Sequence, residues 1–175
     1  RVFFGGGGGA GDGNDSVAGR GGNGGGLVFI IAGHITGTGE ILADGENGGW
    51  SGENATSDSA GGGGAGGSIV ILAGSASGSV ALRARGGEGG WQPLRQLSTN
   101  QAYGPGGGGG GGYIAYNVTG FSTVAVDGGK GGRTTATAVS EFPPNGATAG
   151  SPGATLSSFT TIASCDAFVS GLVFN

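Results

Sequence analysis

Residues 27–50 read LVFIIAGHITGTGEILADGENGGW, and residues 68–91 read SIVILAGSASGSVALRARGGEGGW. The two stretches align without a gap at an offset of 41 residues, and nine of their 24 positions are identical, including a closing tryptophan. A third, looser copy, YIAYNVTGFSTVAVDGGKGG, occupies residues 113–132. Self-similarity at a fixed period is the signature of a repeat architecture. We therefore expect residues 1–175 to form a single glycine-rich repeat domain.

Each copy follows the same plan. A glycine run leads into a short apolar strand, which a turn of Gly, Ser or Thr separates from a second strand. Polar loops follow the first two copies, at residues 51–60 and 92–105, and insertions in repeat proteins usually map to one face. We expect a loop or linker at residues 133–158 and a last apolar strand at residues 159–175. The glycine runs are residues 24–26, 61–67 and 106–112, and the second strands are expected at residues 40–44 and 79–85.

Glycine dominates the composition, with 49 of 175 residues. Gly costs about 1 kcal/mol per position in a helix, which disfavours helices. Every ordered Gly also costs roughly 0.5–1 kcal/mol in conformational entropy, so the runs must gain something that side chains forbid. Close approach of extended, polyproline-II-like backbones is such a gain. We expect an all-β fold, either a repetitive β-solenoid or a layered sandwich of short strands and extended polyglycine (PPII-like) segments.

Charge and hydropathy exclude several classes of protein. The net charge is −4 with only seven Lys and Arg residues, which argues against nucleic-acid binding. No apolar run approaches the roughly 18 residues of a membrane span. Gly does not recur at every third residue throughout, which excludes collagen. Disorder is an alternative for so much Gly and Pro, but the apolar residues are clustered in blocks and the net charge is small.

The apolar strands carry no polar alternation. Residues 28–31 and 69–72 are apolar at every position, whereas a strand with one face in water would alternate. We expect these strands to be buried on both faces, covered by glycine-rich layers or by a neighbouring subunit. The alternative is that they form the core of a small sandwich.

One short segment could bind a metal. Residues 10–17 read AGDGNDSV, close to one calcium-binding nonapeptide of the RTX type. Asp12, Asn14 and Asp15 could offer oxygen ligands to Ca²⁺. Such sites need successive copies, and the next nine residues contain no Asp. A turn held by Asp and Asn side chains is the alternative, and no other cofactor is expected.

The sequence offers little for catalysis, and we expect a protein that is not an enzyme. His34 is the sole histidine, and Ser75 replaces it in the second copy, which favours a surface turn residue over a general base. Stacked copies could bring two carboxylates together among Glu40, Asp44, Glu46 and Glu88, but solvated surface charges are the expected state.

Recognition residues are expected near the loops. Trp50 and Trp91 occupy equivalent places and could stack on sugar rings, although packing on bare glycine backbone is favoured. Arg95 and Tyr103 lie in the second loop and could contact a ligand. Sequons at Asn14, Asn54 and Asn117 are potential N-glycosylation sites.

The two ends of the chain are apolar. The chain starts at Arg1, which is expected of a processed product or a fragment. Cys165 has no internal partner for a disulfide, so we expect a buried thiol or a cross-link to another chain. Apolar ends without polar caps favour head-to-tail association, although the ends could instead tuck into the core. The expected assembly residues are Val2, Phe3, Phe4, Phe168, Val169, Leu172, Val173 and Phe174.

Glycine runs followed by SIVILAG and SVALRARGGEGG resemble the glycine-rich repeats of large extracellular and cell-surface proteins. The composition is also similar to that of polyglycine-II proteins, namely phage tail-fibre tip adhesins and springtail antifreeze proteins. The chain departs from the antifreeze type in lacking a regular Gly-X-X period. The resemblance implies an extracellular or cell-surface protein. From the apolar strands and ends we expect a structural subunit that forms a homo-oligomer, filament or surface layer. The alternatives are a tip adhesin that binds a receptor or glycan through its loops, and an ice-binding protein.

Overall fold

The computed structural model describes residues 2–13, 17–52, 58–93, 104–135 and 147–157, together with Phe159. These residues form seven strands and no helix, which confirms the β-rich class at a coarse level. None of the described residues belongs to a helix that is long and apolar enough to cross a membrane. The strands are β1 (Leu27–Ile35), β2 (Thr38–Leu42), β3 (Ser68–Ala76), β4 (Ser79–Arg83), β5 (Tyr113–Tyr116), β6 (Thr123–Ala125) and β7 (Ala154–Ser157).

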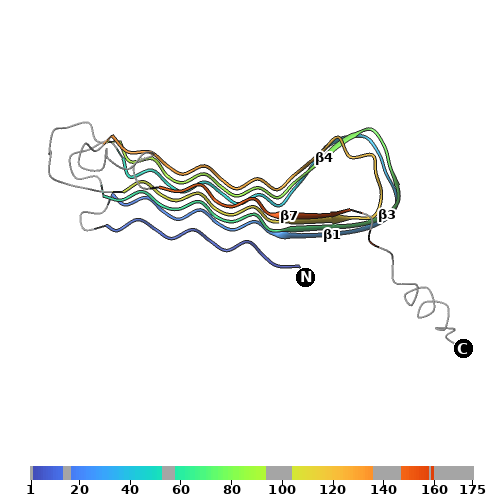
Figure 1. Ribbon diagram of the computed structural model, residues 1–175, viewed down its shortest axis with the longest axis horizontal. Helices are drawn as coiled ribbons and strands as arrows, with labels where there is room; N and C mark the ends of the chain where they lie inside the picture. Colours follow the sequence, from blue (N-terminus) through green and yellow to red (C-terminus); the bar gives the residue numbers. More distant parts are fainter. Residues whose placement is uncertain are drawn as a thin grey trace, which may run out of the picture.

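The chain runs back and forth along one long axis (Figure 1). Four outgoing segments, each a glycine-rich stretch followed by a strand, lead to β1, β3, β5 and β7. Three returning segments begin at β2, β4 and β6 and run back as extended glycine-rich chain. All strands lie in one half of the molecule, which we call the strand end. The described residues that flank the gaps at 14–16, 53–57, 94–103 and 136–146 lie at the opposite, loop end (Figure 1).

The strands pair in two parallel sheets, in the orders β1-β3-β5-β7 and β2-β4-β6. The register pairs Leu27 with Ser68 and Thr38 with Ser79, the same residues that the 41-residue offset aligns. Each return between the sheets turns at a glycine with positive φ: Gly37 (110°), Gly78 (97°) and Gly120 (114°). Such φ values are open to Gly at little steric cost.

A hydrophobic core fills the space between the two sheets. Its largest fully buried side chains are Ile69 and Ile71 of β3, Leu82 of β4 and Ile114 of β5. Side chains alternate along a strand, so Val28 and Ile30 of β1 face the same core, where they are partly buried. The core is therefore centred on the second repeat copy, which has a neighbouring copy on each side.

The glycine-rich half is held by backbone hydrogen bonds with a three-residue period. Gly62 N donates to Gly9 O, Gly63 N to Gly107 O and Gly64 N to Glu46 O, at 2.9, 2.9 and 2.8 Å. Three consecutive amides thus bind three different neighbouring segments. In a β-strand the amides alternate between only two sides, so this half is built differently from the sheets.

Bare backbone is required wherever these segments touch. A Cβ on Gly64 would lie 2.0 Å from Asn23 O, and one on Gly109 would lie 2.0 Å from Gly64 O. Beside them, a Cβ on Gly62 would have no contact closer than 3.6 Å, and position 65 on the same side is Ala. Glycine is therefore essential on the sides that face another backbone and dispensable elsewhere.

One expectation from the sequence is wrong in part, and a second is narrowed by the structure. Residues 133–158 are not all loop, because Ala154–Ser157 form β7, which pairs with β5 at a 41-residue offset. Within the described residues, no glycine-rich layer covers the outer face of β1, where Phe29 is 59% and Ile31 73% exposed, so of the two expected covers only a neighbouring subunit is left for this strand. The outer face of β3 is better covered, because its outward residues Val70 and Leu72 are partly buried. The apolar segment expected after Phe159 lies outside the described residues.

Adjacent glycines of the N-terminal segment provide a matched test of this packing. A Cβ on Gly8 would lie 2.1 Å from Gly62 O, whereas one on Gly9 would have nothing within 4 Å. We expect Gly8→Ala to lower the melting temperature by 5 °C or more, on the order of the shift that 1–2 kcal/mol gives in a domain of this size. Gly9→Ala should leave it within about 2 °C, because a compatible Gly→Ala change is neutral or mildly stabilising. Equal shifts, measured by circular dichroism, would contradict the close-packing account.

Candidate functional site

The outer face of the β1-β3-β5-β7 sheet carries exposed apolar side chains. On β1, Leu27 (41% exposed), Phe29 (59%) and Ile31 (73%) point away from the core that Val28 and Ile30 contact. The register places Phe29 beside Val70, then Ala115 and Leu156 across the sheet. All four are apolar, so the row crosses the whole sheet without a charge.

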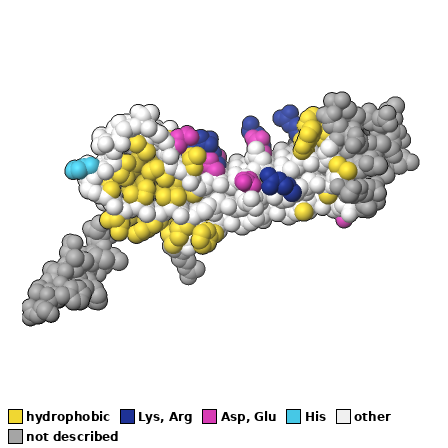
Figure 2. Space-filling view, turned by 180° about the vertical axis from the view of Figure 1, so that it is seen from behind, with side chains coloured by type: hydrophobic (Ala, Val, Ile, Leu, Met, Phe, Trp, Pro, Cys, Tyr) yellow, Lys and Arg dark blue, Asp and Glu magenta, His cyan; other side chains and the backbone are white. Residues whose placement is uncertain are grey.

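The N-terminal residues extend this surface. Phe3 N donates to Ser68 Oγ at 3.0 Å, and Ser68 Oγ donates to Phe3 O at 2.8 Å, which fixes the segment at the start of β3. Val2, Phe3 and Phe4 remain 51%, 50% and 72% exposed. We call the six exposed residues Val2, Phe3, Phe4, Leu27, Phe29 and Ile31 the apolar face. Hydrophobic side chains gather most densely at the strand end (Figure 2).

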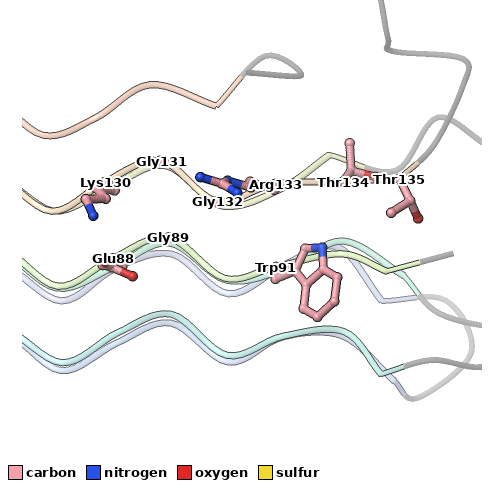
Figure 3. Close-up of a pocket in the computed structure, with 9 residues that line it drawn as sticks. All are labelled: Glu88, Gly89, Trp91, Lys130, Gly131, Gly132, Arg133, Thr134 and Thr135. Carbon is pink, nitrogen blue, oxygen red and sulfur yellow. The ribbon is translucent and has the colours of Figure 1, made fainter. Parts of the chain in front are cut away.

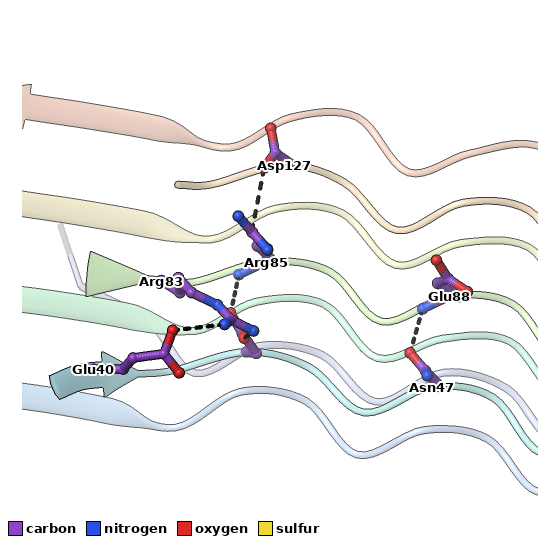
Figure 4. A network of polar contacts seen from close by, with 7 residues as sticks. Glu40, Asn47, Arg83, Arg85, Glu88 and Asp127 are labelled. Atoms are coloured by element: carbon purple, nitrogen blue, oxygen red, sulfur yellow. Dashed lines mark hydrogen bonds and ion pairs between the residues drawn. The ribbon is translucent and has the colours of Figure 1, made fainter. Parts of the chain in front are cut away.

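The outer face of the β2-β4-β6 sheet is different, because ion pairs cross it. Arg83 binds Glu40 at 2.9 Å and Asp44 at 3.0 Å, both from the preceding repeat copy. Arg85 continues the network through Asp127, 3.3 Å away in the next copy (Figure 4). Glu88 N donates to Asn47 Oδ1 at 2.8 Å. These contacts tie successive returning segments together, and they bring Glu40 and Asp44 to one guanidinium.

That guanidinium stays charged at physiological pH. The hydrogen bond from Arg83 to Glu40, followed by its contacts with Asp44, raises the pKa of Arg83 above its usual value against the opposing effect of burial. Carboxylates that are bound to an arginine form strong charge-assisted hydrogen bonds, and this contact favours a stabilising role over proton transfer. Glu40 and Asp44, two of the four carboxylates that the sequence singled out, therefore link the first repeat copy to the second.

A groove lies on the returning segments towards the loop end (Figure 3). Its volume is about 540 Å³, and it runs between two neighbouring segments that Gly89 N joins to Lys130 O at 2.8 Å. One wall carries Glu88 and Trp91. The other wall carries the cationic side chains of Lys130 and Arg133, with Thr134 and Thr135 beyond them. An aromatic ring beside hydrogen-bonding groups is a combination that suits a sugar or another polar ring.

The two tryptophans differ in their surroundings. Trp50 is 56% exposed and Trp91 47% exposed, so neither ring is buried on the glycine backbone. Of the pair, Trp91 lines the groove. Arg95 and Tyr103, expected beside them, lie outside the described residues. The sequence could not reveal Lys130 and Arg133 as groove residues, because that requires the third copy to be placed beside the second.

The remaining predicted residues are only partly placed. Asp12 accepts a backbone hydrogen bond from Ser59 through its carbonyl, while Asn14 and Asp15 lie outside the described residues. Within the described part, no three His, Cys, Asp or Glu side chains come together as a metal site. Asn54, Cys165 and the assembly residues Phe168, Val169, Leu172, Val173 and Phe174 also fall outside it.

Asn117 and His34 both have structural contacts. Asn117 Oδ1 accepts from Ala73 N at 2.8 Å, and its Nδ2 donates to Ala73 O at 2.9 Å, which fastens the turn after β5 to β3. His34 lies within β1, not in the turn expected from sequence. Its Nδ1 is 2.7 Å from Ser75 Oγ, the residue that aligns with it in the repeat.

Comparison with known proteins returns no relative: no protein-family model, no curated protein and no solved structure matches the chain.

Proposed function

We propose that this chain is a non-enzymatic structural subunit of an extracellular assembly, and that it associates with a second copy through the apolar face. The observation that carries the proposal is the contrast between the two sheets. One outer face is crossed by ion pairs, whereas the other exposes Phe29 at 59% and Ile31 at 73%. A sheet that is apolar on both sides is typical of one that is covered on both sides.

A second copy of the same surface is the occupant that fits best. The six residues of the apolar face are all uncharged, so in a self-complementary contact they would set no like charges against one another. Twofold contacts of one surface with itself are the commonest form of association in soluble oligomers. Two sheets packed face to face about 10 Å apart would interdigitate these side chains.

The architecture that supports this role is a proposal as well. We propose that the glycine-rich segments adopt a polyproline-II-like conformation, as in polyglycine II, and that the repeats stack as a layered, solenoid-like unit. The three-residue period of the hydrogen bonds supports it, since PPII has three residues per turn. An extracellular location is supported by the resemblance to glycine-rich surface proteins.

The association is tested by charge substitution on the apolar face. We expect the double change Phe29→Lys and Ile31→Lys to abolish oligomers seen by sedimentation velocity, because it places four like charges in a twofold contact. The matched control is Leu42→Lys, at an apolar residue that is 48% exposed on the other sheet. Its oligomers should persist. A wild-type chain that stays monomeric at millimolar concentration, or equal behaviour of the two variants, would overturn the proposal.

A second candidate function is recognition of a receptor or glycan at the loop end, as in a tip adhesin. The groove between Trp91 and the cations Lys130 and Arg133 favours it, together with the position of the loop-flanking residues at the same end.

The two tryptophans allow a direct test of this candidate. We expect Trp91→Ala to reduce binding to its best ligand on a glycan array at least tenfold, as loss of an aromatic anchor does. Trp50→Ala, which changes the equivalent ring outside the groove, should reduce it less than twofold. Equal losses, or no glycan bound by the wild-type chain, would remove this function.

A further inference from the structure

The segment 147–157, which ends in β7 and pairs with the third copy, is a fourth, partial repeat copy. We infer that the first and fourth copies are caps that close both edges of the glycine-rich half, so that no further glycine layer stacks there in register. The inference depends on the backbone contacts of that half and is independent of the proposed association through the apolar face. According to this inference the glycine-rich half is closed at both edges, and the chain associates with other copies at the strand end. Head-to-tail stacking, expected from the sequence, would then not occur.

Inner copies carry glycine wherever a segment faces the copy before it. A Cβ on Gly61 would lie 2.0 Å from Arg20 O, and a Cβ on Gly106 would lie 1.9 Å from Gly61 O. The returning segments follow the same rule. A Cβ on Gly87 would lie 1.9 Å from Glu46 O, and one on Gly129 would lie 1.8 Å from Gly87 O.

The first copy breaks this rule at three places. Its equivalents of Gly61, Gly64 and Gly87, at the 41-residue offset, are Arg20, Asn23 and Glu46. A carbonyl of a preceding layer would need the space that these side chains occupy, so a layer cannot approach at hydrogen-bonding distance.

The three side chains also bind one another across the edge. Asn23 Nδ2 donates to Glu46 Oε2 at 2.9 Å, and Arg20 lies 4.0 Å from the same oxygen. Their polar groups face solvent, with the side chains of Arg20 and Glu46 exposed at 76% and 53%. A polar outer surface on the terminal repeat is what keeps stacked-repeat proteins soluble.

The fourth copy closes the opposite edge by a different means. In the inner copies, Gly66 N donates to Gly110 O and Gly111 N to Ser151 O, each time towards the following copy. The equivalent residue in the fourth copy is Pro152, which has no N–H to donate. Proline on an edge is a recognised block to further pairing.

The fourth copy also lacks glycine on the side where, in the third copy, the returning segment packs. A Cβ on Gly111 would lie 1.9 Å from Val126 O, and one on Gly108 would lie 2.0 Å from Gly129 O, both in their own returning segment. The fourth-copy equivalents are Pro152 and Ala149, which carry side chains on that side. Gly150 and Gly153, which face the third copy, remain glycine, with Cβ positions 1.9 Å from Gly109 O and Gly112 O.

Removing both caps tests the inference. The uncapped variant carries Arg20→Gly, Asn23→Gly, Glu46→Gly, Ala149→Gly and Pro152→Gly. Both it and its capped parent also carry Phe29→Lys and Ile31→Lys, which suppress association through the apolar face. We expect the parent to sediment as a monomer and the uncapped variant to at least double its mass as concentration rises. A capped parent that forms end-to-end oligomers, or an uncapped folded variant that stays monomeric, would overturn the inference.

A transplant gives a second, independent measurement. Introducing the cap residues into the second copy, as Gly61→Arg and Gly64→Asn, should abolish cooperative thermal unfolding, because both side chains would enter backbone contacts. The reverse changes at the first copy, Arg20→Gly and Asn23→Gly, should shift the melting temperature far less. If the transplant melts like the wild-type chain, the close contacts on which the caps depend are refuted, whatever the uncapped variant does.

Discussion

The structure depends on carbonyl oxygens that occupy the space where a neighbouring Cβ would otherwise stand. At Gly61, Gly64 and Gly109 that distance would be 2.0 Å or less, so the segments approach only because hydrogen replaces the side chain. The large conformational entropy of glycine opposes this arrangement. Hydrogen bonds on three successive sides of the segment 59–67 offset it, since buried peptide groups need partners and find them there. The glycine runs are thus the packed interior of one half of the molecule.

The strand half uses a different principle, and the two are joined in each repeat. Where the segments leave the glycine-rich half they separate into two sheets. The space between the sheets is filled by Ile69, Ile71, Leu82 and Ile114. Hydrophobic burial then replaces backbone contact as the stabilising term. The ion pairs of Arg83 and the apolar face around Phe29 give the two sheets opposite exteriors. We propose that the chain associates through the apolar face. We also propose, from the caps, that the edges of the glycine-rich half face solvent.

Much of this arrangement could be predicted from the sequence, because the first two repeat copies align with one another without a gap. The 41-residue offset gives the pairing of Leu27 with Ser68 and of His34 with Ser75. The fourth copy could not be recognised as a repeat, because among its described residues only Gly150 and Gly153 have a Cβ position that would meet another backbone. Glycine is therefore kept at a three-residue spacing there, without a run. The sequence could not show that Phe29 and Ile31 lack cover within the chain itself, because a hydrophobic run does not reveal that its strand lies at a sheet edge. The groove beside Trp91 needed the third copy in place, since Lys130 and Arg133 supply its other wall.

Amide hydrogen exchange by NMR tests the central claim most directly. The account predicts that the three consecutive amides of Gly62, Gly63 and Gly64 all exchange slowly and with similar protection, because each binds a different neighbouring segment. Fast exchange at all three, or slow exchange restricted to alternate residues as at the edge of a β-sheet, would show that these backbones do not pack as described.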